Sequence, residues 1–83
     1  MPEEVPGLAK RVRELRENLK WSQEELGERA GLSRAWVSLV ELGKITDPKV
    51  GTIAHCAAAL KTTPEYLLYG TVPADSPDVK GAA

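Results

Sequence analysis

Apolar residues recur at helical spacing along most of the chain. Near the start, Leu8, Val12, Leu15 and Leu19 follow one another at steps of four, three and four, which places them on one face of an α-helix. No stretch alternates apolar and polar residues as a strand would, so the pattern predicts an all-α fold. A second helical face is expected to point into the core from Val50, Ile53, Ala54, Ala57 and Leu60.

Local signals predict where the next two helices begin and end. Ser22 is a good N-cap, and Glu25 three residues later completes the pattern of a capping box. Gly31 can adopt the left-handed conformation that closes a helix. Ser33 is expected to cap the following helix, which begins at Arg34, and a glycine at position 43 closes it. The sequence therefore predicts two short helices, 22–30 and 34–42, joined by "AGLS".

Two further helices are predicted towards the C-terminus. Either Asp47, as an N-cap, or Pro48, in the first turn, opens a helix that runs to about residue 60. Thr63 is expected to cap a final helix, with Pro64 at its first position and Gly70 at its end. Loops between the five predicted helices are short, so neighbouring helices must cross steeply.

Length and composition limit the domain organisation. The chain has 83 residues, enough for one domain. We expect this domain to span residues 1–70, followed by a flexible tail at 71–83 that contains two prolines and no periodicity. One cysteine excludes an internal disulfide and fits a reducing compartment. No apolar run approaches the roughly 20 residues that cross a bilayer. A cytoplasmic protein is expected.

Candidate chemistry is sparse. The single histidine and the single cysteine are neighbours, His55 and Cys56, and cannot build a metal site. No nucleophile–base pair and no glycine-rich phosphate loop is present, so we expect neither an enzyme nor a cofactor. The net charge is −1, whereas nucleic-acid binders are usually basic. Any nucleic-acid site must therefore depend on local charge placement.

The two short helices around "AGLS" have the residue types of a helix-turn-helix. Gly27 costs its helix about 1 kcal/mol relative to Ala, and close approach of the second helix explains that cost. Gly31 provides the turn. The positions expected to hold the pair to the domain are all apolar: Leu26, Ala30, Leu32, Val37 and Val40.

The stretch "WSQEELGERAGLSRAWVSLVELGK" resembles the helix-turn-helix of the phage-repressor and Cro family of prokaryotic DNA-binding regulators. The likeness extends to "TPEYLLYG" and covers roughly Leu8 to Gly70. The resemblance implies a compact five-helix domain like that of lambda repressor. It also implies binding to operator DNA as a two-fold dimer, with the second motif helix in the major groove.

By this resemblance, the second motif helix presents side chains to base edges. Arg34 can bind guanine O6 and N7 with a bidentate fork, or contact a phosphate. Leu39 and Leu42 stand where many family members carry polar or basic groups. Leu39 can touch thymine methyl groups and Leu42 can pack on a sugar; alternatively, the pair docks a protein. The predicted base-edge residues are Arg34, Ala35, Ser38 and Leu39.

Phosphate contacts are implied on both sides of this helix. Gln23 matches a family residue that binds a phosphate and supports the second motif helix. The alternative is a glutamine in the first turn of its helix without a partner. Trp36 either stacks on the sugar-phosphate backbone or is partly buried. Arg11 and Arg13 either add positive charge beside the phosphate-contacting residues or are exposed to solvent without a DNA contact. The predicted phosphate-contacting residues are Ser22, Gln23, Trp36, Lys44, Thr46 and Lys49.

Two structural roles are also implied. The resemblance pairs Arg16 with Glu41 in a buried salt bridge that fixes the second motif helix. In the last helix Leu67 is expected to face the core, and the neighbouring side chains form either a dimer contact or a loosely covered patch on a monomer. The candidates for that dimer interface are Tyr66, Leu68 and Tyr69.

Together these features predict a sequence-specific regulator of transcription that binds double-stranded DNA. A repressor acting as a homodimer on a palindromic operator is the leading hypothesis. The alternative is a protein-interaction module of the same fold, such as an antitoxin or a recruiting subunit, favoured by the apolar Leu39 and Leu42 and by the low net charge.

Overall fold

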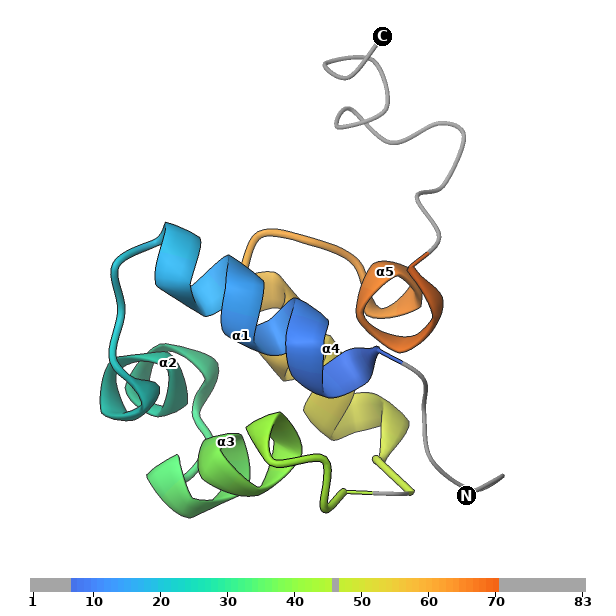
Figure 1. Ribbon diagram of the computed structural model, residues 1–83, viewed down its shortest axis with the longest axis horizontal. Coiled ribbons are helices and arrows are strands. Elements are labelled where there is room, and N and C mark those ends of the chain that lie inside the picture. The colour runs from blue at the N-terminus through green and yellow to red at the C-terminus, as the bar shows by residue number, and fades with distance from the viewer. Residues whose placement is uncertain (1–6, 46, 71–83) are drawn as a thin grey trace, which may run out of the picture.

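The structure is a computed structural model that describes residues 7–45 and 47–70. Five α-helices and no strand lie within these residues (Figure 1), which confirms the predicted all-α fold. The expected tail and Thr46 fall outside the described residues. The helices are α1 (Leu8–Asn18), α2 (Gln23–Ala30), α3 (Arg34–Glu41), α4 (Val50–Ala59) and α5 (Pro64–Tyr69).

Hydroxyl caps define the start of three helices, as predicted. Ser22 Oγ accepts a hydrogen bond from the Glu25 N–H at 3.0 Å, and Ser33 Oγ accepts one from the Trp36 N–H at 3.0 Å. Thr63 Oγ1 does the same for Tyr66 at 3.1 Å. Each bond satisfies one of the N–H groups that a first helical turn leaves without an intrahelical partner.

The predicted start of α4 was wrong. Lys49 is the N-cap, with extended backbone (φ −77°, ψ 140°) and no side-chain cap hydrogen bond. Asp47 is therefore not the cap and Pro48 is not the first helical residue, because extended backbone at Lys49 separates both from the helix. The first N–H groups of α4 consequently have no side-chain acceptor from their N-cap.

Two residues of α4 that were expected in the core are exposed. Val50 is 76% exposed and lies in the first turn. Ala54 is exposed because it lies about 100° around the helix axis from Ile53. The buried stripe instead contains Ile53, Cys56, Ala57 and Leu60, at the i, i+3, i+4, i+7 spacing of one helix face.

The principal helix contacts form a closed ring. Helix α1 packs on α3 and α5, α4 packs on α5 and α2, and α2 returns to α3. Figure 1 shows α1 lying across the middle, with α3 below it and α5 to one side. Every helix contributes to the shared core, which contains Leu8, Val12, Leu26, Ala30, Val37, Val40, Ile53, Cys56, Ala57, Leu60 and Leu67.

Gly27 permits the close approach of α2 to the turn that leads into α3. A Cβ atom at Gly27 would lie 2.7 Å from the Leu32 carbonyl oxygen and 3.3 Å from the Arg34 nitrogen. The Leu32 N–H donates to the Gly27 carbonyl at 2.7 Å, and Gly31 in the turn has φ +71°. The small residue expected at this position is therefore required by backbone atoms, which cannot move aside as a side chain can.

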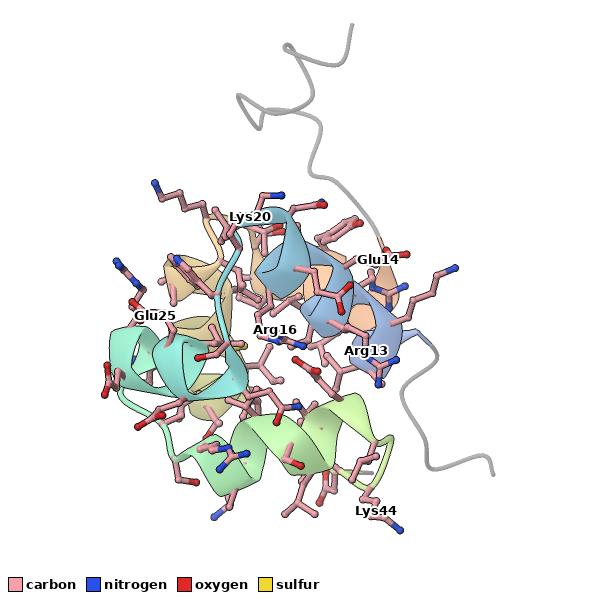
Figure 2. The ribbon with its side chains drawn as sticks, turned by 60° about the vertical axis from the view of Figure 1, so that its left-hand side comes forward. Arg13, Glu14, Arg16, Lys20, Glu25 and Lys44 are labelled. Atoms are coloured by element: carbon pink, nitrogen blue, oxygen red, sulfur yellow. The ribbon has the colours of Figure 1, made fainter. Side chains whose placement is uncertain are left out.

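A buried carboxylate joins α1 to α3. Arg16 Nε donates to Glu41 Oε2 at 2.6 Å and Arg16 Nη2 donates to Glu41 Oε1 at 3.0 Å. Glu41 is 4% exposed. Figure 2 shows Arg16 in the space between α1 and α3. Because both guanidinium bonds point at one carboxylate, they fix distance and orientation together.

Two further side chains complete this group, which we call the Glu41 cluster (Arg13, Arg16, Gln23 and Glu41). Arg13 Nη2 donates to the Glu41 backbone carbonyl at 3.2 Å, and Arg13 Nε lies 3.7 Å from Glu41 Oε1. Gln23 Nε2 donates to Glu41 Oε1 at 3.2 Å. One carboxylate therefore links the two helices of the helix-turn-helix to α1.

The charges in the cluster are mutually stabilised. Burial raises the pKa of Glu41, but the hydrogen bonds from Arg16 and Gln23 and the charges of both arginines outweigh it, so the pKa lies below the ordinary value. The hydrogen bond to Glu41 raises the pKa of Arg16 despite burial. Both groups therefore remain ionised at neutral pH.

Replacing Gly27 should test the close approach. Gly27→Ala is expected to lower the free energy of unfolding by about 1–2 kcal/mol, because the clash with the Leu32 carbonyl exceeds the gain in helix propensity. Gly51→Ala is the matched control, since a Cβ there meets nothing within 4 Å; it should gain about 0.5–1 kcal/mol. Urea unfolding measures both. A Gly27→Ala protein as stable as Gly51→Ala would contradict the argument.

Glu41→Gln should destabilise the fold by about 3–5 kcal/mol, because the charge of Arg16 would lose its buried ionised partner. Glu17→Gln is the control: the Glu17 carboxylate lies 4.0 Å from Arg16 but is exposed, so about 0.5 kcal/mol or less is expected.

The same pair of variants predicts a pH dependence. Because the folded-state pKa of Glu41 lies below the ordinary 4.5, its contribution is present above that pH and is lost as pH falls through the folded-state value. The stability difference between wild type and Glu41→Gln should therefore shrink in acid. A difference that does not shrink at any acid pH at which the wild-type protein remains folded would count against this assignment.

Candidate nucleic-acid interface

Helix α3 has one buried face and one open face. Val37, Val40 and Glu41 are buried, against α1 and α2. The opposite side, which we call the outward face, consists of Arg34, Ala35, Ser38, Leu39 and Leu42. All four residues predicted to reach base edges are therefore on one side of one helix. Arg34 and Ala35 are exposed, Leu39 is 41% exposed and Ser38 is partly buried.

The residues expected at the first phosphate site lie at the start of α2. Ser22 is exposed, and its hydroxyl caps the helix. Gln23 is partly buried and bonds to Glu41, so the interpretation of Gln23 as a residue without a partner is wrong. Its amide nitrogen carries two N–H groups. One is directed at Glu41, and the second remains a donor that a phosphate could accept from.

Trp36 is partly buried and packs against the core, in agreement with the partial burial that the sequence left open. Lys44 and Lys49 are exposed, on the loop that joins α3 to α4. Figure 1 shows α3 running between α2 on one side and this loop on the other. Figure 2 shows the Lys44 side chain extending away from the body of the protein beyond the end of α3.

Local charge favours a polyanion at the outward face despite the net charge of −1. Arg34 opens α3, and Lys44 lies three residues beyond the last helical residue. Glu41 is the one carboxylate in Arg34–Lys44, and it is buried and paired with Arg16. The exposed acids nearest in sequence are Glu24 and Glu28 on α2 and Asp47 on the loop after α3. Asp47 weakens the positive charge of Lys44 and Lys49.

Two arginines that the sequence left undecided have defined partners. Arg13 bonds to Glu41, as described above. Arg11 Nε donates to the Leu67 carbonyl at 3.0 Å, and its guanidinium lies 5.8 Å from the centre of the Tyr66 ring. The spacing of Arg13 and Arg16, three residues apart on a predicted helix, was a usable signal because such residues share a face. No comparable local signal pairs Arg11 with α5.

The three candidate dimer residues differ in what they offer. Tyr66 is partly buried below Arg11, and Leu68 is partly buried against the core. Tyr69 is 69% exposed and so presents most of the uncovered ring surface on α5. Leu67 is fully buried, which confirms the expectation that it faces the core.

Other chemistry is not evident in the described residues. Residues 7–45 and 47–70 contain no group of three His, Cys, Asp or Glu side chains that could hold a metal ion. Within the same residues, no helix is long and apolar enough to span a membrane. Burial, together with the charge of Glu41, raises the pKa of the Cys56 thiol to about 12, so this cysteine stays protonated and unreactive at neutral pH.

Comparison with known proteins agrees with this geometry. Residues 8–67 match the family model described as a helix-turn-helix domain. A search of curated protein sequences gave no match.

Solved structures of DNA-binding regulators superpose on most of the chain. The P22 c2 repressor in complex with a synthetic operator has a TM-score of 0.72 and 31% identity, covering 77% of this chain and 96% of that one. The restriction-modification controller protein C.AhdI from Aeromonas hydrophila has a TM-score of 0.69 and 35% identity, covering 76% and 94%. SinR, the master regulator for biofilm formation, in complex with DNA, has a TM-score of 0.70 and 26% identity. The match covers 74% of this chain and 97% of that one. The chain therefore belongs to the helix-turn-helix domain family and has the fold of phage-repressor-type DNA-binding transcription regulators.

Proposed function

We propose that the protein is a sequence-specific regulator, most simply a repressor, that binds a palindromic operator as a homodimer. The observation that carries this proposal is the outward face of α3. Arg34 and Ala35 are exposed and Ser38 is partly exposed on one side of a helix whose opposite side is fixed in the core. The P22 c2 repressor and SinR, which share the fold, are seen with operator or other DNA.

Phosphate contacts on both sides of α3 would set its depth and register in the groove. On one side, Gln23 has a second amide N–H beyond the one bound to Glu41. On the other, Lys44 and Lys49 are exposed, and the α4 N-cap leaves the first N–H groups without a side-chain acceptor. The positive end of that helix dipole suits a phosphate oxygen.

A two-fold dimer through α5 would place two copies of α3 about 34 Å apart, one turn of B-DNA. The exposed Tyr69 ring supports α5 as the contact, and Tyr66 and Leu68 can add their uncovered parts. The bond from Arg11 to the Leu67 carbonyl holds α5 against α1. A dimer contact on α5 would therefore be rigidly connected to the rest of the fold.

A protein-interaction module is the second candidate function. The observation in its favour is the exposure of two apolar side chains on α3: Leu39 is 41% exposed and Leu42 is 61% exposed. Both lie on the face that the first proposal assigns to DNA. Binding to duplex DNA and its salt dependence distinguish the two candidates, because a protein-docking surface gains nothing from released counterions.

Selection of bound duplexes from a random pool tests the proposed function. The expected result is a palindrome with half-sites one turn apart, and affinity that falls with salt at a log–log slope of about −0.9 for each phosphate contacted. Selection of a single half-site would keep the proposal of sequence-specific DNA binding and would contradict the proposed homodimer. The absence of any duplex binding at low salt would exclude the proposal and favour the interaction module.

Arg34→Ala should reduce discrimination between the selected operator and random DNA by about 1–3 kcal/mol, because a guanine fork would be lost. Gln23→Ala is the comparison variant: it should weaken both DNAs alike, since a phosphate carries no sequence information. Fluorescence anisotropy with both duplexes measures the ratio. Equal losses on both DNAs for Arg34→Ala would assign Arg34 to a phosphate.

A further inference from the structure

Helix α1 is the direct connection between the helix proposed for the dimer contact and the helix proposed to face DNA. In the ring of principal contacts α1 packs on both α5 and α3, whereas the other path from α5 to α3 passes through α4 and α2. Figure 1 shows α5 beside the N-terminal part of α1, and α3 along another side of α1. The position of the outward face relative to α5 therefore depends on how firmly α1 holds both neighbours.

Arginines on opposite sides of α1 make the two connections. Arg11 reaches α5, while Arg13 and Arg16 reach Glu41 on α3. Figure 2 shows Arg13 and Arg16 on the side of α1 that faces α3. At about 100° per residue, Arg11 lies about 140° from Arg16 and about 160° from Arg13 around the helix axis. One short helix thus has a polar contact with α5 on one side and with α3 on the other.

Arg11 fixes the orientation of a helix that is too short to fix its own. Helix α5 has six residues, and Leu67 is its one buried residue, so the core holds α5 at a single point. Arg11 adds two contacts in different directions. Its Nε donates to the Leu67 carbonyl at 3.0 Å, and its guanidinium lies 5.8 Å from the centre of the Tyr66 ring, whose face attracts a cation. Backbone and side chain of α5 are therefore held together.

Two glycines make room for the Arg11 guanidinium where α1 begins and α5 ends. Gly7 is the N-cap of α1 and Gly70 is the C-cap of α5. A Cβ atom at Gly70 would lie 3.1 Å from Arg11 Nη1, and a Cβ atom at Gly7 would collide with the same nitrogen. The guanidinium is therefore packed against backbone from both helices, which limits movement of α5 relative to α1.

We propose that Arg11 is a positioning residue that makes the dimer selective for the spacing between operator half-sites. This inference rests on the proposed function, because it needs a homodimer joined through α5. One added base pair moves the second half-site about 3.4 Å along the DNA axis and turns it by about 35°. A dimer in which α5, α1 and α3 move as one body cannot follow that change with both copies of α3.

Operators with one base pair added or removed at the centre test the spacing selectivity, with fluorescence anisotropy as the measurement. Two linked binding modules gain about 10²–10⁴-fold in affinity, and the gain is lost where geometry forbids simultaneous binding. The wild-type protein should bind both altered operators about a hundredfold more weakly than the selected palindrome. In Arg11→Met, which loses the bond to Leu67, this penalty should fall to about tenfold or less. A wild-type protein indifferent to spacing would overturn the inference.

A duplex with a single half-site separates positioning from a general effect on the fold. It engages one copy of α3, so Arg11→Met should bind it as tightly as the wild type does. Equal losses on the single half-site and on every palindrome would assign Arg11 to the stability of the domain and overturn the inference. Arg11→Lys keeps the charge near the Tyr66 ring and should show an intermediate spacing penalty. If Arg11→Met does not fold, a wild-type penalty in Arg11→Lys overturns the inference.

Arg29→Met is the matched control. Arg29 also lies over an aromatic ring, 4.6 Å from the centre of Trp21, and its Nε lies 2.6 Å from Glu25 Oε2. These contacts join α2 only to itself and to the residue before its N-cap, so the wild-type spacing penalty should persist. A reduced penalty in Arg29→Met would show a non-specific effect and count against Arg11.

The outcomes also separate this inference from the proposed function. If selection yields no palindrome, the proposed homodimer fails and the inference fails with it. If the palindrome is found but Arg11→Met and Arg11→Lys keep the wild-type spacing penalty, the proposed function stands and only the role of Arg11 is removed.

Discussion

The position of α3 depends on one buried carboxylate. In the principal helix contacts, α3 packs only on α1 and α2. The apolar contacts of Val37 and Val40 hold α3 against these helices but do little to prevent its rotation about its own axis. Glu41 supplies the missing orientation, because the fork of Arg16 and the amide of Gln23 reach it from different helices. The same residue therefore sets the angle of the outward face and the direction of the Gln23 amide.

Sequence predicted best those features whose cause is local. Ser22, Ser33 and Thr63 cap the helices they were expected to cap, since a hydroxyl bonds to an N–H only a few residues away. Gly31 and Gly70 close helices with positive φ for an equally local reason. The five-helix arrangement followed because short loops and a single core leave few ways to pack helices of this length.

Features that depend on distant residues were harder to predict. Lys20 and Lys61 adopt the left-handed backbone conformation (φ 63° and 62°), which a sequence usually signals with a glycine. Val50 and Ala54 are exposed because of their positions on α4, in the first turn and about 100° around the axis from Ile53, and their apolar character did not reveal this. The bond from Gln23 to Glu41 spans 18 positions. The base-edge and phosphate residues stay predictions, because their partner is DNA.

The ring of helix contacts also affects how the protein can be made. Leu67 is fully buried, and the contact of α5 with α1 and α4 is what closes the ring. During synthesis, the nascent helix-turn-helix leaves the ribosome well before α5, and until then the core has an open side. A shortened translation product that lacks α5 would therefore carry every residue of the outward face without the support that orients it.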